Sequence, residues 1–189
     1  MPTFDPRNPD FRHAVQESFD RLTLMRTIGA TLERVAPGEV DVMLPFRNDL
    51  TQHHGFIAAA VLTAVVDVAC GYAAMTLMPP GSSVLTIEYK ANFLAPAWGE
   101  KLLARGRVIR PGRTVTVCAG DVVAVDGGRE TLVATLLATM MRVTGERPVS
   151  TPAAETQRHH QSVVHSRRSR RWCLCRAWKT QVPDSTFLV

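Results

Sequence analysis

The first 149 residues lack an excess of charge of either sign. They hold 15 Lys and Arg against 15 Asp and Glu, so the formal net charge of +5 comes from residues 150–189, with seven basic and two acidic side chains. A domain that binds nucleic acid usually presents a concentrated basic face. We therefore expect no specific nucleic-acid partner for these 149 residues, and only weak, nonspecific binding of anions by the tail.

Cysteine is scarce, and its placement excludes a disulfide framework. Cys70 and Cys118 stand alone in apolar stretches, while Cys173 and Cys175 form a short C-x-C in the tail. Small secreted domains held together by disulfides carry many more cysteines. The N-terminal residues also lack the apolar stretch of a signal peptide, since acids and prolines come early. We expect a reducing, cytoplasmic location.

Long apolar runs are absent except for one, residues 55–77, in which Asp67 is the single charge. This length could cross a bilayer. However, an acid at the centre of a span costs about 2.5–3.5 kcal/mol on insertion scales. Lys and Arg do not cluster at either end, and alternating strand patterns follow at once. A helix buried inside a globular domain explains the same composition, so we expect no membrane association.

Apolar periodicity around this buried helix predicts an α+β fold. An amphipathic helix is expected over residues 10–22, and two strands over residues 28–36 and 39–46, separated by Pro37-Gly38. Four strands should follow the buried helix as an antiparallel meander, and the sheet must cover the helix. The expected strands after the helix are residues 83–94, 100–109, 114–125 and 130–143, and the last two flank a hairpin turn at Asp126-Gly127-Gly128.

The first of these four strands shows strict alternation, which predicts its two faces. Leu85, Ile87, Tyr89, Ala91 and Phe93 should face one way, and Thr86, Glu88, Lys90 and Asn92 the other. The domain prediction is a folded unit over residues 1–146, followed by a basic, disordered tail over residues 147–189, where no periodicity is found.

Asp67 is the first candidate for chemistry. A lone carboxylate on an apolar helix must find a partner or stay protonated. Two interpretations are open: a structural group that caps backbone or faces a dimer interface, or a base or nucleophile whose pKa is raised by burial. Gln52, His54 and Gly55 precede the N-terminus of this helix, where free backbone N–H groups suit an oxyanion. No third ligand lies at metal spacing from the adjacent histidines, so no metal site is expected.

Three ordered motifs resemble the PaaI-type branch of the hotdog-fold thioesterases: TQHHGFIAAAVLTAVVDVACGYAA, VLTIEYKANFLAPAWGE and RVIRPGRTVTV. The resemblance covers roughly residues 15–143. It implies an antiparallel sheet wrapped around one long helix, edge-to-edge pairing of two subunits with active sites at their interface, and acyl-CoA thioesters as substrates. A homodimer or homotetramer is expected, and no cofactor.

The resemblance also implies roles for individual residues. Asp67 matches the acid that activates water or attacks the thioester carbonyl, Gln52 matches the polar residue that places substrate or water, and Thr86 falls in the slot of the hydroxyl that assists the water. The arginines of the turn, Arg110 and Arg113, match contacts to the CoA phosphates.

One departure from the family pattern concerns the donor to the developing oxyanion. A His-Gly-Gly or His-Ala-Gly run commonly precedes the acid, and here the same place reads Ala58-Ala59-Ala60. The backbone N–H groups of Ala59 and Ala60 remain as donors, but glycine's close approach is lost. Losing one oxyanion donor can cost about 2.7–4 kcal/mol in the transition state.

Three functions therefore stay open. The first is hydrolysis of acyl-CoA thioesters by Asp67, Gln52 and Thr86, with Ala59 and Ala60 as oxyanion donors. The second, favoured by the alanine run, is a weak or inactive module that binds acyl-CoA or a fatty acyl ligand. The third is a hydratase or dehydratase, which would pair the acid with a histidine, and His54 is the candidate near the site.

Overall fold

The computed structural model describes residues 4–145, so the predicted tail lies outside the described residues. Two short helices and two strands come first: α1 (Phe11–Asp20), α2 (Thr23–Ile28), β1 (Thr31–Ala36) and β2 (Glu39–Pro45). The short turn η1 (Asn48–Leu50) and the long helix α3 (Ala59–Met75) follow. The remaining strands are β3 (Ser82–Phe93), β4 (Lys101–Arg110), β5 (Val115–Asp126) and β6 (Arg129–Thr144).

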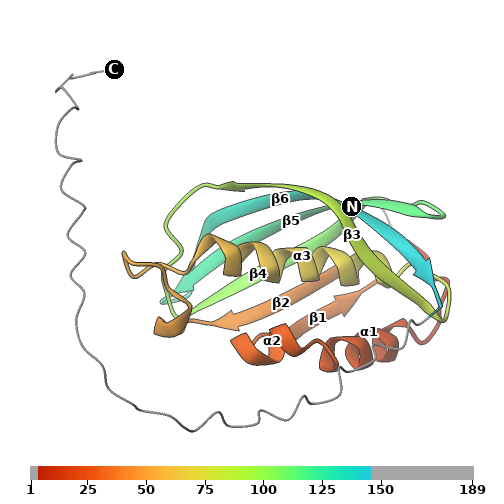
Figure 1. The fold of residues 1–189 in the computed structure, drawn as a ribbon, viewed down its shortest axis with the longest axis horizontal. Helices are drawn as coiled ribbons and strands as arrows, with labels where there is room; N and C mark the ends of the chain where they lie inside the picture. Colours follow the sequence, from red (N-terminus) through yellow and green to blue (C-terminus); the bar gives the residue numbers. More distant parts are fainter. Residues whose placement is uncertain (1–3, 146–189) are drawn as a thin grey trace, which may run out of the picture. The chain divides into compact units, whose positions relative to one another are not determined.

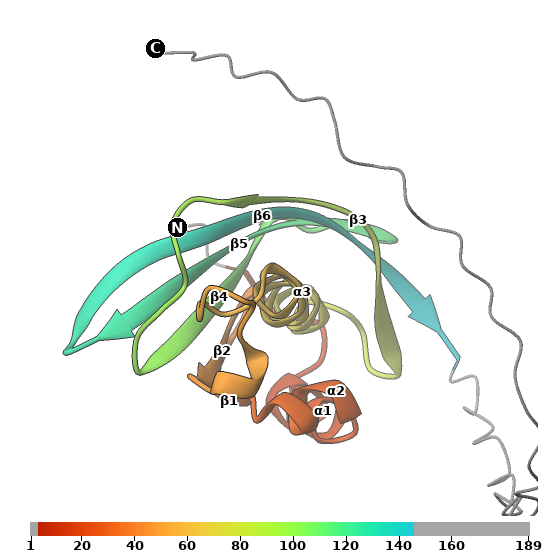
Figure 2. The same ribbon diagram turned by 60° about the vertical axis from the view of Figure 1, so that its left-hand side comes forward.

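The strands form one antiparallel sheet that curves around α3, which confirms the predicted α+β class (Figure 1). Figure 2 shows α3 lying in the hollow of this sheet, with α1 and α2 on the side of α3 away from it. We call the face of the sheet that packs on α3 the inner face, and the opposite one the outer face. Within residues 4–145, no helix combines the length and the apolar character that a membrane crossing needs.

The predicted meander is correct for three strands and wrong for β3. The strand order is β1-β2-β4-β5-β6-β3, so β4, β5 and β6 are consecutive neighbours while β3 pairs with β6 at the far edge. The helix α3 carries the chain across the inner face from β2 to that edge. Alternation in a sequence identifies a strand but not its neighbour, and the crossing by α3 decides the pairing here.

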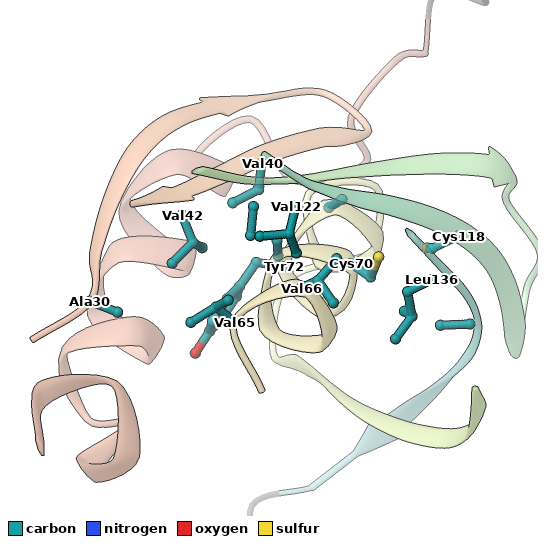
Figure 3. Packing of buried hydrophobic residues seen from close by; sticks show 14 of the residues in the cluster. Ala30, Val40, Val42, Val65, Val66, Cys70, Tyr72, Cys118, Val122 and Leu136 are labelled. Carbon is teal, nitrogen blue, oxygen red and sulfur yellow. The ribbon is translucent and has the colours of Figure 1, made fainter. Parts of the chain in front are cut away.

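Two glycines opposite each other allow α3 to approach the sheet closely. Gly106 on β4 pairs with Gly120 on β5. A Cβ on Gly106 would lie 2.4 Å from the carbonyl oxygen of Ala69 in α3, and one on Gly120 would lie 2.4 Å from Cγ2 of Val66. The helix therefore packs backbone against strand at this level, and Figure 3 shows the valines and Cys70 that surround the contact.

A bulge in β3 changes which side chains share a face. Thr86 pairs with Met140 and Glu88 with Thr139, so Ile87 is an extra residue in the strand. Cross-strand partners lie on the same face of a sheet, and Met140 is buried against α3. The predicted division is therefore wrong at Thr86, which lies on the inner face, and at Leu85, which lies on the outer face opposite Met141. The same register places Tyr89, Ala91 and Phe93 on the inner face as well, opposite Ala138, Leu136 and Ala134.

Candidate functional site

Asp67 lies in the middle of α3, on the side that meets β3. The hydroxyl of Thr86 donates a hydrogen bond of 2.8 Å to Oδ1 of Asp67 and also lies 3.4 Å from Sδ of Met140. The bulge at Ile87 keeps Thr86 on the inner face, where it can reach the helix. The predicted acid and the predicted hydroxyl are thus brought into direct contact by α3 and the strand that follows it in the chain.

The electrostatic environment of Asp67 favours a proton acceptor. Burial raises the pKa of the Asp67 carboxyl above its usual value, and the hydrogen bond from Thr86 lowers it in part. A carboxylate with a raised pKa is a stronger base than an exposed aspartate. The shift is therefore in the direction that general-base chemistry requires.

A pocket of about 320 Å³ opens beside Asp67 and Thr86. Leu22 from the α1–α2 junction and Tyr72 from α3 also line it. The hydroxyl of Tyr72 lies 3.2 Å from Oγ of Ser18 on α1, and either can donate. A pocket of this size and mixed character suits a small organic group. Sequence reasoning did not find Ser18 or Tyr72, since neither carries a motif of its own.

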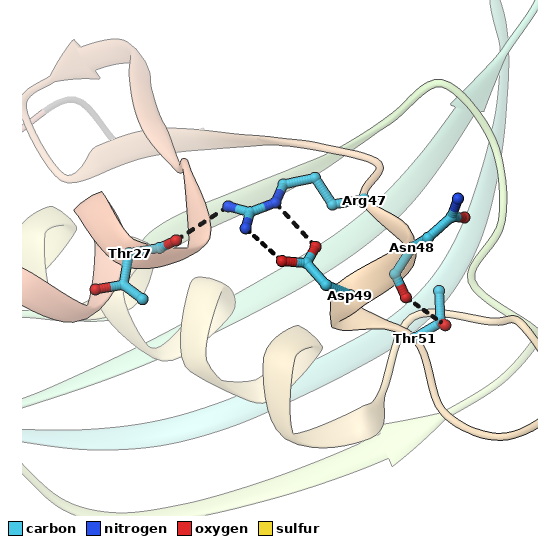
Figure 4. Close-up of polar contacts among 5 residues, drawn as sticks. All are labelled: Thr27, Arg47, Asn48, Asp49 and Thr51. Carbon is cyan, nitrogen blue, oxygen red and sulfur yellow. Dashed lines mark hydrogen bonds and ion pairs between the residues drawn. The ribbon is translucent and has the colours of Figure 1, made fainter.

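The loop ahead of α3 is held firmly. The guanidinium of Arg47 donates to both carboxylate oxygens of Asp49, at 3.0 and 2.6 Å, and to the carbonyl of Thr27 at 3.0 Å (Figure 4). Further along, Ala58 donates its backbone N–H to the carbonyl of Leu50 at 3.0 Å. The start of α3 is therefore fixed to the end of α2 and to η1.

The predicted loop residues lie away from Asp67 within one chain. Gln52 uses its side-chain oxygen to accept the backbone N–H of His54, and Gly55 closes the turn with φ of +82°. Neither Gln52, His54 nor Gly55 lines the pocket at Asp67. The rings of His53 and His54 are 4.0 Å apart. Across residues 4–145, no three His, Cys, Asp or Glu side chains gather as a metal site would need.

The alanine run forms the N-terminus of α3. Ala58 is the N-cap residue and has no side-chain cap. Ala59 and Ala60 are exposed, and no backbone acceptor is found for their N–H groups among residues 4–145. Such first-turn donors carry the positive end of the helix dipole. Asp67 follows Ala59 by eight residues, which is about 12 Å at the rise of an α-helix, so donors and acid of one chain cannot reach the same atom.

The two arginines at the β4–β5 turn lie in different places. Arg110 pairs with Val117 after a second bulge, and it lies on the outer face because the neighbouring Cys118 is buried on the inner one. Arg113 instead lines a second pocket, at the C-terminal end of α3. The structure therefore does not bring the two predicted anion contacts together.

The buried cysteines are unsuited to nucleophilic catalysis. Burial raises the pKa of the Cys118 thiol to about 12, and burial together with nearby Cys118 raises that of Cys70 well above its usual value. Thiols with such values stay protonated and unreactive at neutral pH. Both therefore act as small apolar residues of the core.

Comparison with known proteins places this geometry in context. A family model described as the Thioesterase superfamily matches residues 54–131. A solved thioesterase family protein from Silicibacter pomeroyi is 43% identical, with a TM-score of 0.70, over 71% of this chain and 99% of that one. A Halobacterium salinarum protein named as a candidate esterase is 30% identical over 58% of this chain and 75% of its own length. The solved PaaI protein of E. coli, from the phenylacetic acid degradation operon, is 16% identical with a TM-score of 0.65, over 74% of this chain and 97% of that one, and shares the fold.

Proposed function

Because this chain belongs to the thioesterase superfamily and has its hotdog fold, as its motifs predicted, we propose that it hydrolyses acyl-CoA thioesters to a free acid and CoA. The observation that carries the proposal is the contact of 2.8 Å between Thr86 and Asp67, a carboxylate of raised pKa at the wall of a pocket of about 320 Å³. The pocket would take the acyl group, and the carboxylate would act on the thioester carbonyl at its mouth.

Two routes use the same residues. In the first, Asp67 takes a proton from water while the water oxygen bonds to the carbonyl carbon. The C–S bond of the resulting tetrahedral intermediate then breaks, and the CoA thiolate takes the proton. In the second, a carboxylate oxygen of Asp67 bonds to the carbonyl carbon and the CoA thiolate leaves. Water then hydrolyses the mixed anhydride. Thr86 orients the carboxylate in both, because its hydroxyl donates to Oδ1.

A second copy of the chain would complete the site. The N–H donors of Ala59 and Ala60 lie about 12 Å along α3 from Asp67, so one thioester can meet both only if the donors come from another protomer. The edge strand β3 offers the surface for it. Tyr89 and Phe93 are 48% and 50% exposed on the inner face, past the cover of α3. Pairing two β3 edges would cover them and bring one copy's loop, including Gln52, toward the other's acid. We therefore propose a homodimer. A homotetramer would contain the same pairing of two chains.

The alanine run supports the alternative function. The missing histidine takes a polar group from the site, and the methyl groups of Ala59 and Ala60 narrow the approach to their own N–H donors. An acyl-CoA would then bind beside Asp67 and be turned over slowly or not at all. This module would use the same pocket, so binding alone does not separate the two functions.

Thioester cleavage is measured directly with a thiol-reactive dye. Purified protein is given acyl-CoAs with short, long and aromatic acyl groups, beside Asp67→Asn and a control, Asp126→Asn, which changes the same charge in an exposed hairpin. We expect CoA release by the wild type and the control, and a loss of at least about 100-fold in kcat for Asp67→Asn. Binding of every acyl-CoA without release would establish the binding module instead. Equal rates for wild type and Asp67→Asn would exclude Asp67 as base or nucleophile.

A further inference from the structure

The pocket beside Asp67 extends from that residue in one direction along α3. Among the lining residues on α3, Asp67 comes first and Tyr72 last. The contact of Thr86 with Asp67 lies at one end of the pocket, which continues between the next turn of α3 and Val84 on β3. From Asp67 to Tyr72 this is about 7.5 Å at the helical rise. A group that enters beside the acid therefore has room toward the C-terminal end of α3.

Gly71 lines this pocket about one helical turn beyond Asp67. Residues four positions apart lie on the same face of a helix, so both residues face the pocket. A Cβ on Gly71 would meet Cγ1 of Val84 at 3.7 Å, which is an ordinary contact. The protein itself therefore has room for a side chain at this position.

Neither packing nor backbone conformation requires a glycine at position 71. Gly106 and Gly120 differ, since a Cβ on either would lie 2.4 Å from an atom of α3. The φ angle of Gly71 is outside the left-handed region, and glycine weakens the interior of a helix relative to alanine. What this glycine provides is empty space in the pocket, one turn from the acid.

The wall of the pocket next to Gly71 is held from two sides. The ring of Tyr72 lies 5.8 Å, centroid to centroid, from that of Phe19, and its hydroxyl lies 3.2 Å from Oγ of Ser18. Both partners belong to α1, and Tyr72 is buried. A methyl group added at Gly71 would therefore narrow the pocket, because Tyr72 is not free to move away from it.

We propose that the acyl group of the substrate extends from Asp67 over Gly71 toward Tyr72, and that Gly71 determines which acyl groups the site accepts. This inference rests on the proposed function, because it takes the thioester carbonyl to lie at Asp67. Gly71 follows Asp67 by four residues, about 6 Å at the helical rise. An acetyl group ends short of Gly71, whereas a hexanoyl group reaches it. The preferred substrates are therefore esters of acyl groups longer than acetyl, whose carbons gain burial against Val68 and Gly71.

Calorimetric titration with thioethers of CoA tests this placement without turnover. S-hexyl-CoA and S-ethyl-CoA have no carbonyl to hydrolyse, and each is titrated into the full chain and into Gly71→Ala. We expect the wild type to bind S-hexyl-CoA more tightly, and Gly71→Ala to lower the ratio of the two affinities about tenfold, as for a modest steric overlap. A ratio that Gly71→Ala leaves unchanged, or a wild type that does not distinguish the two thioethers, would overturn the proposal.

Gly106→Ala is the matched contrast, because its added methyl group displaces α3 and does not enter the pocket. This variant should keep the wild-type ratio of affinities for the two thioethers. A fall of the ratio as large as that in Gly71→Ala would show that a general shift of α3 is sufficient, and the role of Gly71 would be refuted.

Release of CoA from hexanoyl-CoA and acetyl-CoA separates this inference from the proposed function. We expect Gly71→Ala to lower the ratio of kcat/KM for the two esters about tenfold. If the wild type releases no CoA while the thioether affinities change as expected, hydrolysis is refuted and the placement of the acyl group is supported. If both esters lose rate by the same factor, Gly71 acts on the chemistry at Asp67 and the proposal fails.

Discussion

Replacement of Gly106 by alanine tests whether close packing of α3 on the sheet both stabilises the fold and places the acid. The added Cβ would lie 2.4 Å from the carbonyl oxygen of Ala69 and 2.5 Å from the amide nitrogen of Cys70. These are backbone atoms that no rotamer change can move. The φ angle of Gly106 is outside the left-handed region, so alanine can adopt this backbone conformation. The substitution is therefore unfavourable because of the steric overlap alone.

The magnitude follows from the distances. Relief of the overlap requires α3 to move by about 1 Å, from 2.4 Å to the ordinary contact distance of 3.4 Å. Overpacking of this kind costs about 1–3 kcal/mol, and the upper end applies because backbone must shift. Alanine also reduces the conformational entropy of the unfolded chain, which offsets about 0.4–1 kcal/mol of this loss of stability. A net loss of about 2 kcal/mol lowers Tm by roughly 4–8 °C for a chain of this size.

The same shift should be felt at the site. Ala69 follows Asp67 by two residues, so a movement of α3 changes the geometry of the hydrogen bond of 2.8 Å between Thr86 and Asp67. A misplacement of about 1 Å can lower kcat/KM by up to about 100-fold. Urea denaturation at fixed protein concentration gives the loss of stability, and CoA release gives the loss of rate.

Gly71→Ala is the matched control for stability. Its Cβ would meet only Cγ1 of Val84 at 3.7 Å, an ordinary contact. In a helix interior, alanine is more stabilising than glycine by about 1 kcal/mol. This variant should therefore be at least as stable as the wild type. A Gly106→Ala protein as stable as the wild type would refute the packing argument, whatever its activity.

Three further predictions concern titratable groups. Burial raises the pKa of Asp67, so kcat/KM should fall as the pH drops through a value above that of an ordinary aspartate. Thr86→Val should move this limb to still higher pH, and a limb that stays in place would contradict the role of Thr86. The folded state binds the Asp67 proton more tightly than the unfolded state, so this group costs stability as pH rises from 3.8 through the raised pKa. Asp67→Asn should therefore unfold at higher urea concentration than the wild type at pH 7, and a lower midpoint would show that the charge is stabilising. Cys70 and Cys118 should resist iodoacetamide in the folded protein at pH 8, as peptide-level mass spectrometry would show, and fast labelling of either would contradict its burial.

The buried helix and its acid could be predicted from the sequence, because an apolar run with one carboxylate has few other solutions. The α+β class followed from the same run. The family motifs singled out Asp67 and Thr86 as site residues, but they did not predict the hydrogen bond between them. The short helix α2 was missed. Its last residue, Ile28, was read as the start of a strand, whereas Gly29 ends the helix with φ of +78° and Met25 is buried beneath it.

Features that depend on pairing could not be predicted. A bulge adds one residue without any signal in composition, so the alternation around Ile87 gave the wrong face for Thr86. Arg7 and Arg142 stand 135 positions apart in the sequence and line the same pocket. Ser18 and Tyr72 likewise become neighbours through the packing of α1 on α3.

Charged side chains on the outer face of β3 would also determine the register in which two β3 strands pair. Glu88 and Lys90 lie on that face, opposite Thr139 and Leu137 of β6. If two copies of β3 run antiparallel about a twofold axis at Tyr89, Glu88 of each copy stands opposite Lys90 of the other. A slip of two residues in either direction sets glutamate against glutamate or lysine against lysine, which is unfavourable. In the proposed dimer, charge would thus select one symmetric alignment out of several that the apolar side chains alone would accept.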